Sequence, residues 1–183
     1  TIKSHINPHF IFNSLNSIRA LVDENPERAR KAITELSNIL RSSMQAEKSE
    51  TVPLERELDI VKDYLALEQM RFEERLKIEF EIDEDTLQQQ VPPMMLQTLV
   101  ENAIKHGISP NSQTGTIEII SRRTQAGRWQ VCVNNSLAAE SNAVSTHTGL
   151  TNLQHRLQVE THFDQSLWHQ HLPTLCLLTL VEN

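Results

Sequence analysis

The segment SHINPHFIFNSLNSI (residues 4–18) places a histidine, His9, directly after a proline and between two phenylalanines. A neutral imidazole is a competent nucleophile when one ring nitrogen faces solvent, and a phosphorylated imidazole is a high-energy phosphoryl donor to an aspartate. A histidine on an amphipathic helix is nevertheless far more often an ordinary surface or core residue. A second signal is therefore needed before a function can be assigned to His9.

The segment VPPMMLQTLVENAIKHGI (residues 91–108) carries groups that suit a magnesium nucleotide. On one helix, Asn102, Lys105 and His106 stand at i, i+3 and i+4 and share a polar face, opposite a face of leucine, valine and alanine. The amide oxygen of Asn102 suits Mg²⁺, and the neighbouring cations suit phosphate oxygens. The same spacing fits an ordinary amphipathic helix with a solvated face, so these residues alone leave both interpretations open.

Amphipathic helices are predicted for most of the first 75 residues. Apolar residues recur there at helical spacing in three stripes: Ile11/Leu15/Ile18/Val22, Ile33/Leu36/Leu40 and Leu54/Leu58/Val61/Leu65. The second stripe follows an Asn25-Pro26 start signal, and the third follows Pro53. A hairpin of long helices has little core of its own, so its apolar stripes need a second copy to cover them. We therefore predict a homodimer.

The hydrophobic period changes from helical to two after residue 75. Strands are predicted at LKIEFEI (76–82), TIEIIS (116–121), WQVCV (129–133) and TLCLLTLV (174–181), with helices near 94–106 and 149–161. This mixture predicts an α+β fold with helices on one face of a mixed sheet. We expect helices for dimerisation and phosphotransfer at residues 1–75 and an α/β sandwich at 76–183.

Composition excludes several classes of function. The net charge is −7, and no run of basic residues interleaved with aromatics appears, so we expect no direct binding of nucleic acid. No apolar stretch approaches the roughly 20 residues that span a bilayer. The chain opens with Thr1 inside a helix-like motif, and we interpret it as a fragment whose missing N-terminal part could hold a membrane segment. Cys132 and Cys176 are expected to be free thiols in a reducing cytosol.

The two chemical segments together resemble the LytS family of sensor histidine kinases. The stretch around His9 is similar to that family's phosphoacceptor box, with its NPHF-hydrophobic-FN-x-LN signature, and residues 91–108 resemble its N-box. LSNILRSSM (36–44) and VPLERELDIVKDYLALEQMRF (52–72) resemble the segment between the two boxes. The resemblance implies the ATP-binding fold shared with gyrase-type ATPases and Hsp90, the use of ATP and Mg²⁺, and a response regulator, of LytTR type, as partner. It also implies the cytoplasmic domain of a bacterial inner-membrane protein.

The same resemblance assigns roles to single residues. It makes His9 the phosphorylated residue and Asn102 the Mg²⁺ ligand, with Lys105 and His106 near the triphosphate. Glu101 falls in the N-box as a helper to the metal site or to His9. Asn13, four residues after His9, stands where related kinases keep a side chain that orients water for dephosphorylating their partner. His5 falls where the family has Gln, and we regard it as a bystander.

The match fails where the family has glycines. Its VxDNGxG box corresponds here to VNNSL (133–137), in which Asn135 aligns best with the aspartate that reads the adenine amino group and Asn134 is the other candidate. The lid motif GxGIGLxN is reduced to STHTGLTN (145–152), and its nucleotide-binding positions would be Thr148, Gly149 and Leu150. Glycines let backbone amides approach phosphates closely, so their loss predicts weak nucleotide binding.

Three functions remain open at this point. The leading one is phosphorylation from Mg-ATP of His9 in the same or the partner subunit, followed by transfer to an Asp of the regulator. The second is a degenerate dimeric module that binds a partner without turning over ATP, which the altered 133–137 box supports. The third is an ATPase switch of the gyrase or Hsp90 type without phosphohistidine, which the intact segment around His9 disfavours.

Overall fold

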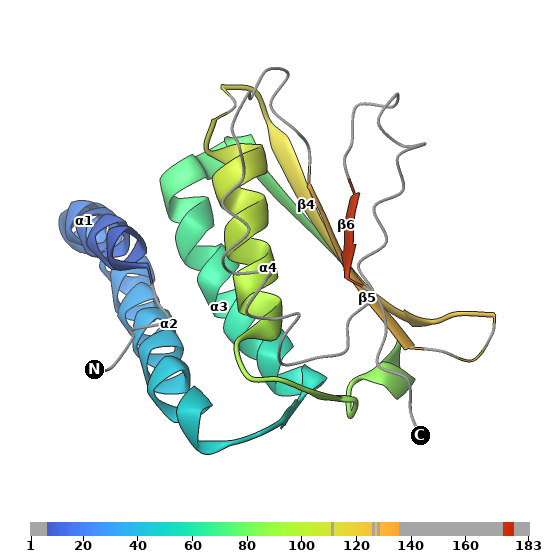
Figure 1. Cartoon of the computed structure of the whole chain (residues 1–183). Helices are drawn as coiled ribbons and strands as arrows, with labels where there is room; N and C mark the ends of the chain where they lie inside the picture. Colours follow the sequence, from blue (N-terminus) through green and yellow to red (C-terminus); the bar gives the residue numbers. More distant parts are fainter. Residues whose placement is uncertain (1–6, 111, 126, 128, 136–173, 178–183) are drawn as a thin grey trace.

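The first two helices form an antiparallel hairpin in the computed structural model, which describes residues 7–110, 112–125, 127, 129–135 and 174–177. They are α1 (Pro8–Glu24) and α2 (Pro26–Gln45) (Figure 1). Each begins with an Asn-Pro pair: the side chains of Asn7 and Asn25 accept hydrogen bonds from the backbone N–H groups of His9 and Arg28. Proline then occupies the first helical position, where its missing N–H costs nothing. Both predicted helices are thus confirmed.

The third helix, α3 (Leu54–Phe72), packs against the hairpin on one side and against α4 (Met95–Ala103) on the other. Arg28 donates to the carbonyl oxygen of Ala66 at 3.2 Å, and Asn38 donates to the Asp63 carboxylate at 2.9 Å. A short strand, β1 (Val52–Pro53), precedes α3 and pairs antiparallel with β3 (Gln90–Val91). These contacts fix the hairpin relative to α3.

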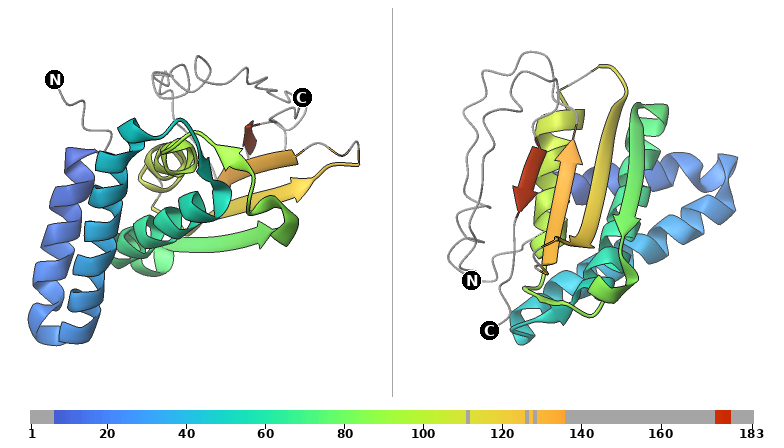
Figure 2. Two further views of the ribbon diagram at one scale, coloured as in Figure 1. Left: turned by 90° about the horizontal axis from the view of Figure 1, so that it is seen from below. Right: turned by 90° about the vertical axis from the view of Figure 1, so that its right-hand side faces the viewer.

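A four-stranded sheet lies behind α3 and α4. Its strands are β2 (Leu76–Ile82), β4 (Gly115–Arg123), β5 (Trp129–Asn135) and β6 (Thr174–Leu177), and they follow one another in that order across the sheet. The β2–β4 pair is parallel and the other two pairs are antiparallel. The helices gather on one face of this mixed sheet, as Figure 2 shows. The α+β fold class predicted from the sequence is confirmed.

One hydrophobic core joins the hairpin, α3, α4 and the sheet, running from Phe10 to Val133. The sequence divides the chain near Arg75, yet α3 contributes both to the helical hairpin and to the layer above the sheet. The division into residues 1–75 and 76–183 stays a prediction. In the part of the chain that the structure describes, no helix is long and apolar enough to cross a membrane.

The apolar side chains on one face of β2 are less buried than the sequence pattern predicts. Leu76 is buried, but Ile78 and Ile82 are half-buried and Phe80 is 39% exposed, with the Lys62 ammonium 5.9 Å from its ring centre. The reason is that β2 stands at the edge of the sheet, where the helical layer does not cover it fully. The predicted helix at 149–161 and residues 178–181 of the last predicted strand lie outside the described residues.

Candidate active site

His9 is the second residue of α1 and is exposed. Its position follows from its neighbours: Asn7 caps the helix, Pro8 starts it, and Phe10 is buried. The Phe10 ring packs on Tyr64 of α3, with ring centres 4.6 Å apart and planes inclined by 32°. This contact fixes the N-terminus of α1 against α3. Because the N-terminus of a helix favours negative charge, this position suits a side chain that acquires a phosphoryl group.

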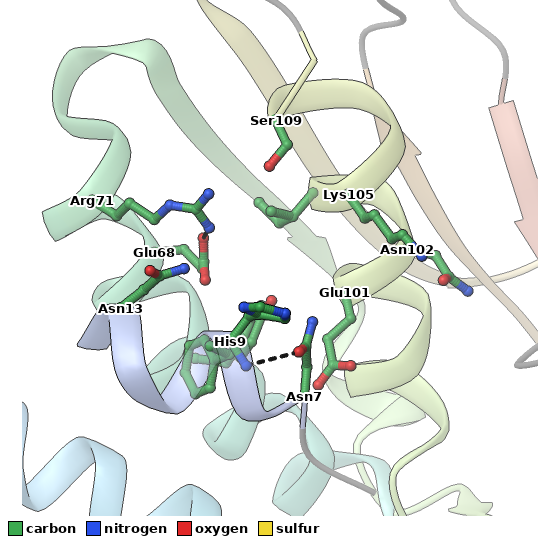
Figure 3. Close-up of a pocket in the computed structure, with 12 residues that line it drawn as sticks. Asn7, His9, Asn13, Glu68, Arg71, Glu101, Asn102, Lys105 and Ser109 are labelled. Carbon is green, nitrogen blue, oxygen red and sulfur yellow. Dashed lines mark hydrogen bonds and ion pairs between the residues drawn. The ribbon is translucent and has the colours of Figure 1, made fainter. Parts of the chain in front are cut away.

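A cavity of about 400 Å³ opens beside His9. Its walls come from the start of α1, the C-terminal half of α3, the end of α4 and the turn that follows α4 (Figure 3). Five of the residues predicted from the sequence line it: His9, Asn13, Glu101, Asn102 and Lys105. The volume lies in the range of small-molecule sites. The fold thus brings the histidine segment and the N-box segment, about 90 residues apart in sequence, to one cavity.

Two carboxyl groups flank His9 in Figure 3: Glu68 from α3, which is buried, and Glu101 from α4, which is half-buried. Burial raises the pKa of Glu68 to about 7; the Arg71 guanidinium opposes this shift and the Glu101 carboxyl adds to it. Burial likewise raises the pKa of Glu101 to about 6, against a hydrogen bond that Gln97 donates at 2.9 Å. Groups with pKa values near neutrality can exchange protons at physiological pH.

Asn102 and Lys105 extend from α4 on the side away from His9, as Figure 3 shows. Glu101 lies between these two side chains and the imidazole. The cavity therefore has an amide and ammonium side that suits a metal-bound phosphate, and an imidazole and carboxyl side that suits nucleophilic and proton-transfer chemistry.

The polar face predicted for Asn102, Lys105 and His106 spans a change from α-helical to π-helical geometry. After Ala103 the chain continues as a π-helical turn, η4 (Ile104–Ile108). Such turns shift the angular position of the residues that follow, and they are frequent at functional sites. Lys105 lines the cavity, whereas His106 is not among its lining residues. Of the three residues assigned to one polar face, Asn102 and Lys105 line the cavity, and a role of His106 near the triphosphate stays a prediction.

The start of α4 is fixed by a carboxylate from α3. Met94 has a positive φ of 66°, and the backbone N–H groups of Met94 and Leu96 donate to the two oxygens of Glu57 at 2.9 and 3.1 Å. Glu57 is buried; burial raises its pKa, while these backbone hydrogen bonds oppose the shift. Both of its oxygens are thus used in positioning α4, and with it Glu101 and Asn102.

The two asparagines of the altered box occupy opposite faces of β5. Asn135 is buried on the same face as Val131 and Val133, which belong to the core beneath the helices. Asn134 lies on the other face and donates to Glu118 at 2.7 Å. The helix-side position favours Asn135 over Asn134 as the residue that could reach a nucleotide held against α4. Thr148, Gly149 and Leu150 lie outside the described residues.

Sequence reasoning missed Glu68 and Arg71 as residues of the cavity. A signal was present: Glu57 and Glu68 occupy positions of the buried stripe of α3, where apolar residues are expected. Charged residues are almost never fully buried unless they are paired or functional. A carboxylate on the apolar stripe is therefore a sequence signal for a capping or site residue.

Comparisons with known proteins match this chain to histidine kinases. A family model described as "Histidine kinase" matches residues 1–76. The "Sensor protein LytS" of Staphylococcus haemolyticus is 41% identical over 121 residues, which are 66% of this chain and 21% of that protein. The "Sensor histidine kinase/phosphatase LytS" of Staphylococcus aureus (strain Mu50) is 37% identical over 136 residues, 74% of this chain and 23% of that protein. The chain belongs to the LytS family of sensor histidine kinases.

This LytS-family chain spans about a fifth of the length of the curated relatives that it matches. Among solved structures, the histidine kinase AdeS of Acinetobacter baumannii aligns with 95% of the chain and 96% of its own length, at 12% identity and a TM-score of 0.52. At that identity the likeness concerns the fold alone. It supports the arrangement of helices and mixed sheet described above.

Proposed function

We propose that this chain is the kinase core of a two-component sensor: it binds Mg-ATP, transfers the γ-phosphoryl group to His9, and passes it to an Asp of a response regulator. One observation carries the proposal, namely that an exposed His9 at a helix N-terminus shares a cavity with Glu101, Asn102 and Lys105. Phosphoryl transfer requires mainly positioning and charge neutralisation, which such a cavity can supply.

The residues present fit a magnesium nucleotide. Mg²⁺ keeps several waters and takes one or two protein oxygens together with substrate phosphates, so a single amide from Asn102 is a sufficient protein ligand. Bound there, the metal would neutralise phosphate charge. Lys105 would contact phosphate oxygens, and the Asn135 carbonyl would accept a hydrogen bond from the adenine amino group. An amide makes a weaker bond there than a carboxylate, so we expect weak nucleotide affinity.

We further propose that transfer runs within one chain. His9 and the α4 residues belong to the same chain and line the same cavity. The hairpin that carries His9 is held to α3 by the Phe10–Tyr64 ring contact and by the Arg28 and Asn38 hydrogen bonds. For this transfer, the γ-phosphate would have to pass the Glu101 side chain to reach the imidazole.

A second copy of the chain would cover the outer face of the hairpin. Phe12, Leu15 and Val22 on α1 and Ile33 on α2 are 49–65% exposed. A run of exposed apolar side chains along a helical hairpin is typical of a bundle interface. We propose a homodimer through this face, a LytTR-type response regulator as partner, and a place as the cytoplasmic domain of a bacterial inner-membrane sensor.

Labelling with γ-labelled ATP tests the proposed function. With Mg²⁺ present, the folded chain should acquire label that is stable in base and lost in acid, as expected of a phosphorylated imidazole. The alternative is a degenerate module that dimerises without turning over ATP, and the replacement of a carboxylate by Asn135 is the observation that favours it. A folded dimer that acquires no label would support that alternative, and ATP hydrolysis without label would support an ATPase switch.

Asn13→Ala is expected to spare labelling of His9 and to slow dephosphorylation of the phosphorylated regulator by about 10-fold or more. Asn13 lies one turn after His9 and lines the same cavity, so its amide can orient a water molecule without taking part in the attack by the imidazole. The phosphatase activity named for the Staphylococcus aureus relative makes this assay relevant. Loss of the two activities in equal measure would contradict the assignment.

A further inference from the structure

We propose that Glu68 of α3 is the acidic partner of His9, which orients the imidazole and accepts the proton that the ring loses on phosphorylation. The inference rests on the proposed function and adds to it a positioning residue from a third helix. The cavity brings Glu68 and His9 together, and Figure 3 shows the Glu68 carboxyl beside the imidazole.

The helix that carries His9 has no acidic residue near that histidine. The acidic residues of α1 are Asp23 and Glu24, at the end opposite His9, and the residue that follows His9 is Phe10. A histidine nucleophile is held in one tautomer by an acceptor that binds the N–H of its second nitrogen. That acceptor must therefore come from across the cavity, where Glu68 and Glu101 are the carboxyl groups among the lining residues.

Glu68 has an unused acceptor, and this separates it from the other buried acids. Glu68 is 2% exposed, and its Oε2 atom has no hydrogen-bond partner. Its ion pair with Arg71 is long, with 3.7 Å between Nη1 and Oε2. Both oxygens of Glu57 accept from backbone, whereas Glu101 is only half-buried and one of its oxygens accepts from Gln97. A buried acceptor left open beside an imidazole is placed to receive its N–H.

The chemical step balances with Glu68 as proton acceptor. The unprotonated ring nitrogen of His9 attacks the γ-phosphorus, a nitrogen–phosphorus bond forms, and the bond from that phosphorus to the bridging oxygen of ADP breaks. The ring then carries a positive charge and one N–H. The Glu68 carboxylate takes that proton, which leaves neutral phosphohistidine and a protonated carboxyl group.

The charged and titratable groups that line the cavity together with Glu68 come from four elements. Tyr64 and Arg71 lie on α3, Glu101 and Lys105 lie on α4 and η4, and His9 lies on α1. Burial raises the pKa of Glu68 to about 7. At neutral pH its carboxylate is therefore present to accept the proton, and the protonated carboxyl group can release the proton later. The nearby Arg71 guanidinium keeps the ionised form accessible despite burial.

Glu68→Gln tests the proposal, with Glu74→Gln as the matched control because Glu74 is an exposed acid just after the same helix. In Glu68→Gln we expect kcat for His9 labelling to fall by about 100-fold with KM for ATP nearly unchanged. The part of the wild-type rate increase near pH 7 that comes from ionisation of Glu68 should be absent. Nitrogen NMR of the nucleotide-free chain should show one His9 tautomer in the wild type and a mixture in Glu68→Gln.

Urea unfolding curves verify that the Glu68→Gln variant is folded. Folding raises the pKa of Glu68 from 4.5 to about 7. The protonated Glu68 therefore contributes stability to the folded wild type that is fully present below pH 4.5 and is lost as the pH rises through 7. Glu68→Gln should therefore match the wild-type midpoint near pH 4.5 and exceed it at pH 8. An unlabelled wild type would overturn the proposed function, whereas the tautomer shift would still support the His9–Glu68 contact. A labelled wild type with Glu68→Gln unchanged in rate, pH profile and tautomer would overturn the role of Glu68.

Discussion

A His9→Gln chain is expected to take up no acid-labile, base-stable label from γ-labelled ATP, whereas the unsubstituted chain is labelled. Glutamine has no nucleophilic ring nitrogen, so the whole rate of transfer is lost rather than a fraction of it. The helix should remain intact because its cap uses the backbone N–H of His9, and the side chain is exposed. The measurement is label retained after base treatment, with the helical signal in circular dichroism checked in parallel.

His5→Gln is the matched control for that variant. His5 stands four residues before His9 and, by the family resemblance, falls where Gln is usual. It should therefore be labelled like the wild type. Undiminished label in His9→Gln would place the phosphoryl group on another residue and would contradict the assignment of His9.

An Asn102→Ala chain is expected to lose labelling by at least about 100-fold and to lose the dependence of its residual rate on Mg²⁺. The substitution removes the amide oxygen proposed as the protein ligand of the metal. It leaves the apolar face of α4 and the Glu57 cap at its start unchanged, so the fold should persist. Initial rates across a Mg²⁺ titration and calorimetric binding of Mg-ATP measure the effect.

Asn16→Ala serves as the comparison, because Asn16 is an exposed amide on α1 that does not line the cavity. Its rate and Mg²⁺ dependence should equal those of the wild type. A fall of the same size in both variants would show a general effect of amide removal. A normal Mg²⁺ dependence in Asn102→Ala would exclude Asn102 as the metal ligand.

Much of the fold could be predicted because its signals are local. The Asn25-Pro26 pair supplies a capping side chain and a fixed φ, so α2 begins where the sequence indicates. The period-two pattern of residues 76–82 correctly indicates a strand. It did not indicate that Phe80 would be exposed, because the place of a strand in its sheet is set by distant segments.

The candidate site could be predicted only in part, for the same reason. The family resemblance predicted roles for His9, Glu101 and Asn102, and the fold brings these residues to one cavity. The prediction for His106 assumed a regular helix, whereas a π-helical turn begins at Ile104 and His106 does not line the cavity. The apolar stripe of α3 could have marked Glu68 as a buried acid, but a pattern within one helix does not report that Glu68 shares a cavity with His9 on another helix.

The central claim is that His9 receives the phosphoryl group from a nucleotide held by α4 of its own chain. Mixing His9→Gln chains with Asn102→Ala chains that carry different affinity tags tests it directly, with co-purification of the two tags confirming mixed dimers. Each chain then lacks one half of its own site, so the account predicts no recovery of labelled protein. Label appearing on the Asn102→Ala chain of the mixed dimer would show transfer between subunits and would contradict the account.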